Sequence, residues 1–462
     1  MTTNKPLTIM QKFLRKEFPI FPGANFIKPA PAHILNKFSY SLLGKGMLSP
    51  KLMEIRRDIS KLDNLLPSNA TRETKEEFLR SIDILVNSDK RSFPKGNFSS
   101  FFLVSKELIN GSDPSDNGYG EALVSIFSGE QISIISNYLK LLLDPIDSDD
   151  LVSKFILVIQ EILKIKVDEN FRENKFIDNK ETHFGNYIFE VLVSGMTKMV
   201  KEKNKSTRIS NIQKLSIFLT SAVALGMLYE ANLKNLGTKN SPAPNEILGI
   251  FCYTNFPPGN PRSVLTKLAQ ASLKDAIFKS YSGCMNTFES IFKNVNKTSD
   301  IENIVLQRIQ GEPSRDLIKI IGNNKTPDEL KEVFASTVTL SDYSSAFRTL
   351  SHKIGLVGPV KGTGEKRMMF ETSFLEVLVY FLSQEGDTFN DFVNNCYSKL
   401  GLVVGKPENI TNETIDKLTK LARRNADIHE CLEESHEFLR QRLVISGLAR
   451  EFSDGFTIMG QS

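Results

Sequence analysis

The residues with the clearest potential for chemistry lie in a glycine-rich basic segment, Gly358 to Arg367. Glycines let a backbone wrap closely around a phosphate, and the N-terminus of the helix expected just after the segment would favour an anion. A Walker A loop, however, requires Gly-Lys followed directly by Ser or Thr, whereas Gly364 is followed by Glu365. We therefore expect no nucleotide hydrolysis. The segment is interpreted first as a basic linker and second as a contact for backbone phosphates. Three residues would make that contact: Lys361, Lys366 and Arg367.

The densest basic cluster lies at the junction of two expected helices in the first half of the chain. Positive charges at this density can pair with nucleic-acid phosphates, and such binding weakens with rising salt concentration. The simpler interpretation is a solvated helix junction, because no aromatic or RNA-recognition motif stands beside the cluster. Six residues form it: Lys198, Lys201, Lys203, Lys205, Arg208 and Lys214. Four of them are candidate nucleic-acid contacts: Lys201, Lys203, Lys205 and Arg208.

Two further patterns imitate metal or nuclease sites but have simpler explanations. His429 and His436 are seven residues apart on an expected helix, so about 10 Å of helix axis would separate them, too far for one ion. We expect both on a solvated helix face. The acidic-x-Lys letters within Pro327–Lys331 suggest a nuclease, but Thr326 and Glu329 explain them as the capping box of a helix. The sequence therefore predicts no metal, no cofactor and no catalytic residue.

The composition is that of an ordinary soluble protein. With 462 residues, 40% hydrophobic and 24% charged, the chain can bury the cores of roughly two to four domains. A net charge of +4 permits a nucleic-acid partner without requiring one. The four cysteines are far apart, which favours a reducing cytoplasm over a disulfide framework or a zinc finger. The longest apolar stretch, Leu215–Tyr229, is shorter than the roughly 20 residues of a membrane span, so we expect a buried core helix and no membrane partner.

Helical periodicity dominates the chain, for example in Ile209–Leu236 and Val264–Phe292. Two stretches rich in proline or glycine interrupt it, Asn240–Pro261 and Gly355–Gly364. The first contains a short apolar island, Leu248–Cys252. We predict a mainly α-helical protein of multi-helix domains that ends in a small α+β module. The predicted domains are an N-terminal helical domain over residues 1–239, a middle helical domain over 262–354 and a C-terminal module over 368–462.

The last part of the chain carries the most specific local signals. One helix should end at Gly401, followed by the β-like run Leu402–Gly405. A later helix over Ile428–Ile445 should stop at Gly447. Asp454-Gly455 then stands between two β-prone runs, which is the strongest short-range signal of a β-hairpin. Helices followed by a hairpin resemble a winged-helix module, which usually docks on DNA or on another protein.

Three stretches of this module are similar to the C-terminal module of accessory proteins from bacterial antiphage defence islands: Phe370–Glu376, Tyr397–Gly405 and Leu443–Gly455. Those proteins typically accompany a translocase or helicase-type ATPase and a nuclease. The resemblance covers about a fifth of the chain, implies a cytoplasmic complex subunit and transfers no active-site residue. We therefore expect a non-catalytic scaffold or nucleic-acid-contacting subunit of a multiprotein antiphage defence complex. Its partners would be other protein subunits, such as an ATPase or nuclease, and DNA or RNA through backbone phosphates.

Two alternatives remain open. The first is a viral nucleoprotein that encapsidates single-stranded RNA in a basic groove between two helical lobes. The helical length, the proline-rich boundary in mid-chain and the mild basicity support it. The second is an enzyme whose active site is assembled from residues far apart in the sequence, which no local motif would reveal.

Overall fold

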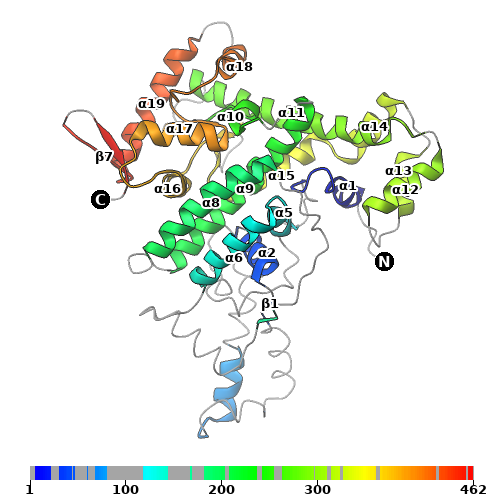
Figure 1. Cartoon of the computed structure of the whole chain (residues 1–462), viewed down its shortest axis with the longest axis horizontal. Helices are drawn as coiled ribbons and strands as arrows, with labels where there is room; N and C mark the ends of the chain where they lie inside the picture. Colours follow the sequence, from blue (N-terminus) through cyan, green and yellow to red (C-terminus); the bar gives the residue numbers. More distant parts are fainter. Residues whose placement is uncertain are drawn as a thin grey trace. The chain divides into compact units, whose positions relative to one another are not determined.

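A computed structural model is mainly helical over the residues that it describes, as the sequence predicts, with a few short strands (Figure 1). The described residues are 6–21, 31–43, 45–46, 60, 68–80, 118–143, 167–168, 182–202, 208–236, 242–253, 263–295, 297–309, 314–322, 326–359, 365–422, 426–453 and 456–460. The chain divides into two compact units. Unit 1 comprises Met1–Ile27, Thr182–Leu192 and Ser221–Ser462, and unit 2 comprises Lys28–Glu181 and Val193–Thr220. The division into three domains, with boundaries at 239–262 and 354–368, stays a prediction.

Unit 2 contains the helices α2 (Pro31–Leu43), α5 (Tyr119–Ser125) and α6 (Gly129–Leu143) and the paired strands β1 (Lys45–Gly46) and β2 (Val167–Asp168). α2 and α5 meet in close contact at Gly120. A Cβ atom on Gly120 would lie 2.5 Å from the backbone nitrogen of Phe38, so only glycine permits this approach. The rings of Phe38 and Phe127 extend the contact edge to face.

Two long helices, α8 (His183–Lys201) and α9 (Arg208–Leu236), each contribute residues to both units. The prediction that Leu215–Tyr229 is a buried helix is confirmed, and both Leu219 and Val223 are fully buried. Among the described residues, Ser210–Leu236 is the one helix long and apolar enough to cross a membrane by length and composition, and 83% of its most apolar window is buried in the protein. A helix that is apolar on all sides and buried is typical of a protein core.

α11 (Val264–Phe292) has the bounds that its periodicity predicts and packs closely on the unit 1 part of α9. At Gly283, a Cβ atom would lie 1.9 Å from the carbonyl oxygen of Ala231. The Ser280 hydroxyl donates to the carbonyl of Leu228 at 3.0 Å, and the Asn232 amide donates to Ser280 at 3.1 Å. Small and polar residues therefore join these helices at a place where large side chains would separate them.

α11 also contacts α14 (Pro327–Thr337) and α15 (Leu340–Lys353), while α1 (Pro6–Leu14) contacts α12 (Thr298–Arg308) and α13 (Ser314–Ile321). Phe13 of α1 stacks on Phe292 with ring centroids 5.5 Å apart. The predicted capping box of α14 is confirmed. The hydroxyl of Thr326 accepts from the backbone nitrogen of Glu329, and the Glu329 carboxylate accepts from the backbone nitrogen of Thr326. The acidic-x-Lys letters are therefore a helix start.

Four short strands of unit 1 are hydrogen-bonded side by side. β3 (Ile250–Phe251) pairs in parallel with β6 (Leu402–Val403), and β4 (Val357–Gly358) pairs antiparallel with β5 (Arg367–Met368). Tyr253 joins the two pairs, since its backbone nitrogen donates to the carbonyl of Met368 at 2.8 Å. The apolar island around β3 is therefore a buried strand, and the β-like prediction at Leu402 and Val403 is confirmed.

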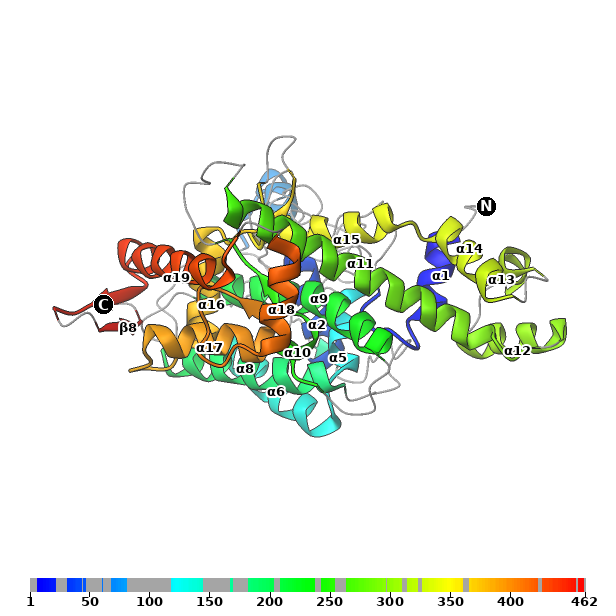
Figure 2. The ribbon, with the colours of Figure 1, turned by 90° about the horizontal axis from the view of Figure 1, so that it is seen from above.

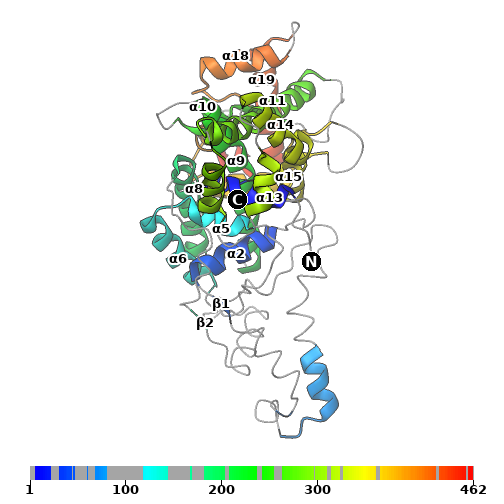
Figure 3. The same cartoon turned by 90° about the vertical axis from the view of Figure 1, so that its right-hand side faces the viewer.

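The C-terminal helices are α16 (Thr372–Leu382), α17 (Phe389–Leu400), α18 (Asn412–Ala422) and α19 (Ile428–Ile445). The short helix α10 (Pro244–Ile247) and α11 both contact α18 (Figure 3). Gly401 ends α17 with φ 68°, and Gly447 follows α19 with φ 70°. This left-handed backbone favours glycine, so both predicted helix ends are confirmed.

β7 (Ala449–Glu451) and β8 (Thr457–Met459) form the predicted antiparallel hairpin, with Arg450 opposite Ile458. The turn residues Asp454 and Gly455 lie outside the described residues. Figure 2 shows the hairpin at the outer end of α19, away from α11. Thr388, in the connection between α16 and α17, forms a further antiparallel bridge with Ile458. The hairpin is thus tied to the start of α17.

Candidate interaction surface

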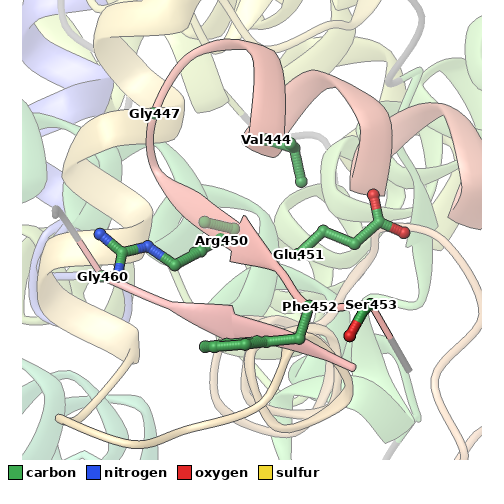
Figure 4. Close-up of a pocket in the computed structure, with 8 residues that line it drawn as sticks. Val444, Gly447, Arg450, Glu451, Phe452, Ser453 and Gly460 are labelled. Carbon is green, nitrogen blue, oxygen red and sulfur yellow. The ribbon is translucent and has the colours of Figure 1, made fainter. Parts of the chain in front are cut away.

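The C-terminal hairpin has one buried face and one exposed face, because side chains alternate along a strand. Three of its residues are buried: Ala449, Thr457 and Met459. On the opposite face, Phe452 and Phe456 remain 44% and 59% exposed. Figure 4 shows Arg450 and Phe452 on one side of β7 and Glu451 on the other. The two rings belong to residues paired across the hairpin, because the backbone nitrogen of Phe452 donates to the carbonyl of Phe456 at 2.8 Å, and neighbouring exposed apolar residues form the larger patches that mark binding surfaces.

Contacts on its other side hold the hairpin in place. Arg440 of α19 donates to the two carboxylate oxygens of Glu437, at 2.8 and 3.0 Å, and also to Glu451 of β7. The hydrogen bonds from Arg440 lower the pKa of Glu437. On the second strand, the backbone nitrogen of Met459 donates to the carbonyl of Asp387 at 2.9 Å. The exposed aromatic residues therefore stand on a fixed support, which reduces the entropy lost on binding.

A hollow of about 580 Å³ lies between β7 and the end of α19, with Val444, Arg450 and Phe452 in its lining (Figure 4). Beside it, Ile445 is 86% exposed, the most of any large apolar side chain among the described residues. Ile445 is the last residue of α19, so it stands at the outer end of the helix next to the hollow. The hollow has a mixed lining, since Arg450, Glu451 and Ser453 belong to it as well as Val444 and Phe452.

The exposed face of α19 is acidic. Glu430, Glu433 and Glu434 are all exposed, and Glu433 pairs with Lys406 from the loop after β6. The hydrogen bond from Lys406 lowers the pKa of Glu433, so this carboxylate is charged at neutral pH. Carboxylates repel phosphates, so this part of α19 is unsuited to contact with a nucleic-acid backbone.

The basic residues expected to contact nucleic acid belong to different units. Lys201 is exposed at the end of α8, and Arg208 is the first residue of α9; both fall in unit 2. Lys366 and Arg367 fall in unit 1, where the Lys366 amine donates to the carbonyl of Pro359 at 2.5 Å. The described part of the chain does not include Lys203, Lys205 and Lys361, nor the side chain of Arg208. Nucleic-acid contact by this set stays a prediction.

The two histidines of α19 differ in their surroundings. His429 is exposed, as expected. His436 instead packs its ring on Phe389, 4.6 Å between ring centroids, and its Nδ1 accepts from the backbone nitrogen of Lys406 at 3.2 Å. Burial lowers the pKa of His436, so the imidazole is neutral and joins the helix to a loop. The expectation of a solvated face is therefore wrong for His436. No cluster of potential metal ligands occurs among the described residues.

The four cysteines are free and buried, which makes them weak nucleophiles. Burial raises the pKa of Cys252, Cys284, Cys396 and Cys431, and a thiol reacts through its thiolate. Their burial is consistent with a role in packing.

The structure also reveals a polar pocket that no sequence motif indicated. It measures about 230 Å³ and lies among α9, α10, α11 and α18. The amine of Lys417 donates to the carbonyl of Leu248 at 2.5 Å and lies 3.6 Å from a carboxylate oxygen of Asp275. Burial lowers the pKa of Lys417 to about 8. These partners are far away in the sequence, so no local pattern could have identified the pocket.

Comparison of the chain with protein-family models, with curated proteins and with solved structures finds no match.

Proposed function

We propose that this chain is a non-catalytic scaffold subunit that binds a partner protein through its C-terminal helix and hairpin. The observation that carries the proposal is the pair Phe452 and Phe456, 44% and 59% exposed on a hairpin that is held in place. Large aromatic side chains contribute much of the binding energy of protein interfaces when a partner encloses them. We define the surface formed by Ile445, Arg450, Phe452 and Phe456 as the hairpin surface.

The charge of the first half of α19 indicates what a partner that contacts both this helix and the hairpin would carry. Glu430 and Glu434 are exposed in the first two turns of α19, at the opposite end of the helix from Ile445 and the hairpin. A complementary partner would offer an apolar pocket for the phenylalanines and lysine or arginine side chains facing α19. DNA or RNA that ran along the first half of α19 would bring phosphates close to carboxylates that repel them.

A winged-helix-like module is the architecture that we propose for this region. Its support is the order of helices followed by a hairpin, together with the bridge between Thr388 and Ile458, which adds a third backbone segment to the hairpin. The acidic face of α19 is compatible with a winged helix that serves protein docking.

We further propose that the complex acts in antiphage defence in the cytoplasm, with an ATPase or nuclease as the partner. The support is the resemblance of Phe370–Glu376, Tyr397–Gly405 and Leu443–Gly455 to accessory proteins of bacterial defence islands. These stretches contribute to α16, α17 and β6, and to the end of α19 with the hairpin. The third stretch therefore contains the hairpin surface itself up to the turn.

Site-specific photo-crosslinking in the cells that encode the protein tests the proposal. A photoreactive amino acid replaces Phe452 or Phe456, and in a control chain it replaces Phe278, which is 58% exposed on α11. We expect one protein to be captured from both hairpin positions and not from Phe278. RNA captured at the hairpin positions would contradict the proposal and favour the nucleoprotein alternative. Equal capture from all three positions would also contradict it.

A further inference from the structure

Arg367 is a buried cation without a counterion among the residues that the structure describes. Its side chain is 4% exposed, and its guanidinium lies 4.9 Å from the ring centroid of Tyr253. Its Nε is enclosed and has no hydrogen-bond acceptor. Burial lowers the pKa of Arg367, but a guanidinium stays charged in proteins. A buried charge normally has a partner of opposite charge, so the absence of one among the described residues requires an explanation.

The neighbouring sequence offers no carboxylate to fill this role. β3 and β5 are joined at Tyr253 and Met368, and the chain on both sides of this junction is basic. Residues 254–274 and 359–367 together contain six basic residues and one acidic residue, Glu365. Glu365 pairs with Lys274 of α11 at 2.7 Å. The basic residues are Arg262, Lys267, Lys274, Lys361, Lys366 and Arg367.

Arg367 belongs to β5, which lies against β3 and the helix α11. The parallel strand β3 leads into the N-terminus of α11, and α11 contacts both β3 and β5. Gln270 of α11 donates to the carbonyl of Glu365, which fixes the residues just before β5 against the helix.

We propose that Arg367 is the anchor of an anion site that takes a phosphate group. A guanidinium donates two parallel hydrogen bonds to phosphate, and burial strengthens them because water does not compete. The phosphate belongs either to a free phosphorylated compound or to a nucleic-acid backbone. The site is separate from the hairpin surface, so a test of anion binding by Arg367 is independent of the proposed scaffold function.

Thermal unfolding of the full chain distinguishes this role from a structural one. The variants are Arg367→Met and, as a matched loss of one positive charge nearby, Lys274→Met; the probe is sodium pyrophosphate. Without probe, we expect Arg367→Met to unfold at the same temperature as the wild type or higher, since it removes an uncompensated buried charge. With probe, the Tm of the wild type and of Lys274→Met should rise by at least about 2 °C and saturate, and that of Arg367→Met should not change.

Three results would overturn the proposal. One is the absence of any saturable rise in the wild type. Another is an equal rise in all variants. The third is a Tm of Arg367→Met that is lower than that of the wild type without probe but rises by the same amount when pyrophosphate is added. That result would make Arg367 a structural partner of Tyr253. Should Arg367→Met fail to fold, Arg367→Lys keeps the charge but loses the two-pronged donor, and its affinity for pyrophosphate should fall at least about fivefold.

A second set of probes identifies the source of the phosphate once the site is established. A single-stranded oligonucleotide of about twelve nucleotides is compared with a mononucleotide at equal phosphate concentration. A stronger effect of the oligonucleotide that declines with salt assigns the site to nucleic acid, and equal effects assign it to a free phosphorylated compound. Both results require Arg367, and either effect persisting in Arg367→Met would contradict the assignment.

Discussion

Glu230 and Arg367 are two buried ionisable residues of unit 1, and they differ in whether they can lose their charge. Glu230 is 8% exposed and its Oε1 has no hydrogen-bond partner. A carboxyl group can avoid the penalty of burial by holding a proton, and burial raises the pKa of Glu230 to about 7. Arg367 has no such option, because a guanidinium does not release its proton. Glu230 is therefore explained within the fold, whereas Arg367 points to a ligand.

The protonation of Glu230 makes stability depend on pH. Its pKa is about 7 in the folded protein, against an ordinary value of 4.5, although a hydrogen bond from Thr182 and the charge of Lys234 partly offset the effect of burial. Between these values the folded state binds more protons than the unfolded state. The contribution to stability is fully present below pH 4.5 and is lost as the pH rises through 7. We expect Glu230→Gln to remove this loss and to exceed the wild type by up to about 3 kcal/mol at pH 8.

Urea unfolding of both proteins at pH 5 to 8 provides the measurement. The control is Glu302→Gln, a change at an exposed position of α12. The wild type and the control should lose stability along the same curve, while Glu230→Gln should not. If all three curves run parallel, Glu230 is ionised in the folded protein and its burial does not matter.

At the scale of elements, the crossing of α9 and α11 depends on Gly283. A Cβ atom there would lie 1.9 Å from the carbonyl oxygen of Ala231, which is backbone and cannot rotate away. Gly283→Ala must therefore separate the helices and weaken the hydrogen bond from Ser280 to Leu228. We expect it to lower the free energy of unfolding by about 2 kcal/mol or more. Gly129→Ala, at a helical position with open space around it, should change stability by no more than about 0.5 kcal/mol. Chemical denaturation compares the two, and equal small effects would show that the crossing is loose.

Elements whose ends depend on local chemistry were predictable from the sequence. The capping box at Thr326, the stop at Gly401 and the stop at Gly447 each involve residues within one helical turn, so the bounds of α14, α17 and α19 follow from short patterns. β3 was not predictable in this way, since it becomes a strand only by pairing with β6, about 150 residues later.

For the candidate site residues too, the sequence predicts only what local patterns determine, and not the contacts between distant elements. The basic character around Arg367 is visible in the sequence, but its burial over Tyr253 depends on the junction of β3 with β5. Similarly, His436 looked solvated because its contacts with Phe389 and Lys406 come from other elements. The hairpin itself was predicted from Asp454-Gly455, whereas the side on which its phenylalanines are exposed depends on the packing of Met459 and Ala449.

At the scale of the whole molecule, unit 1 carries two different kinds of proposed site. The hairpin surface contains three exposed apolar residues beside Arg450, while the sequence on both sides of Arg367 and Tyr253 is rich in basic residues. A net charge of +4 hides this difference, because opposite charges in different regions cancel in the total. Under the two proposals, the chain would bind a protein at one of these sites and an anion at the other.

The most direct test of the central claim is the affinity for the protein that crosslinks to the hairpin. Isothermal titration calorimetry compares the wild type, the double variant Phe452→Ser with Phe456→Ser, and Phe278→Ser as the control for loss of an exposed phenylalanine elsewhere. We expect the double variant to bind roughly 100-fold more weakly or worse, because both aromatic anchors are lost, and the control to bind within about twofold of the wild type. A double variant that binds as tightly as the wild type would contradict the assignment of the hairpin surface as the docking site.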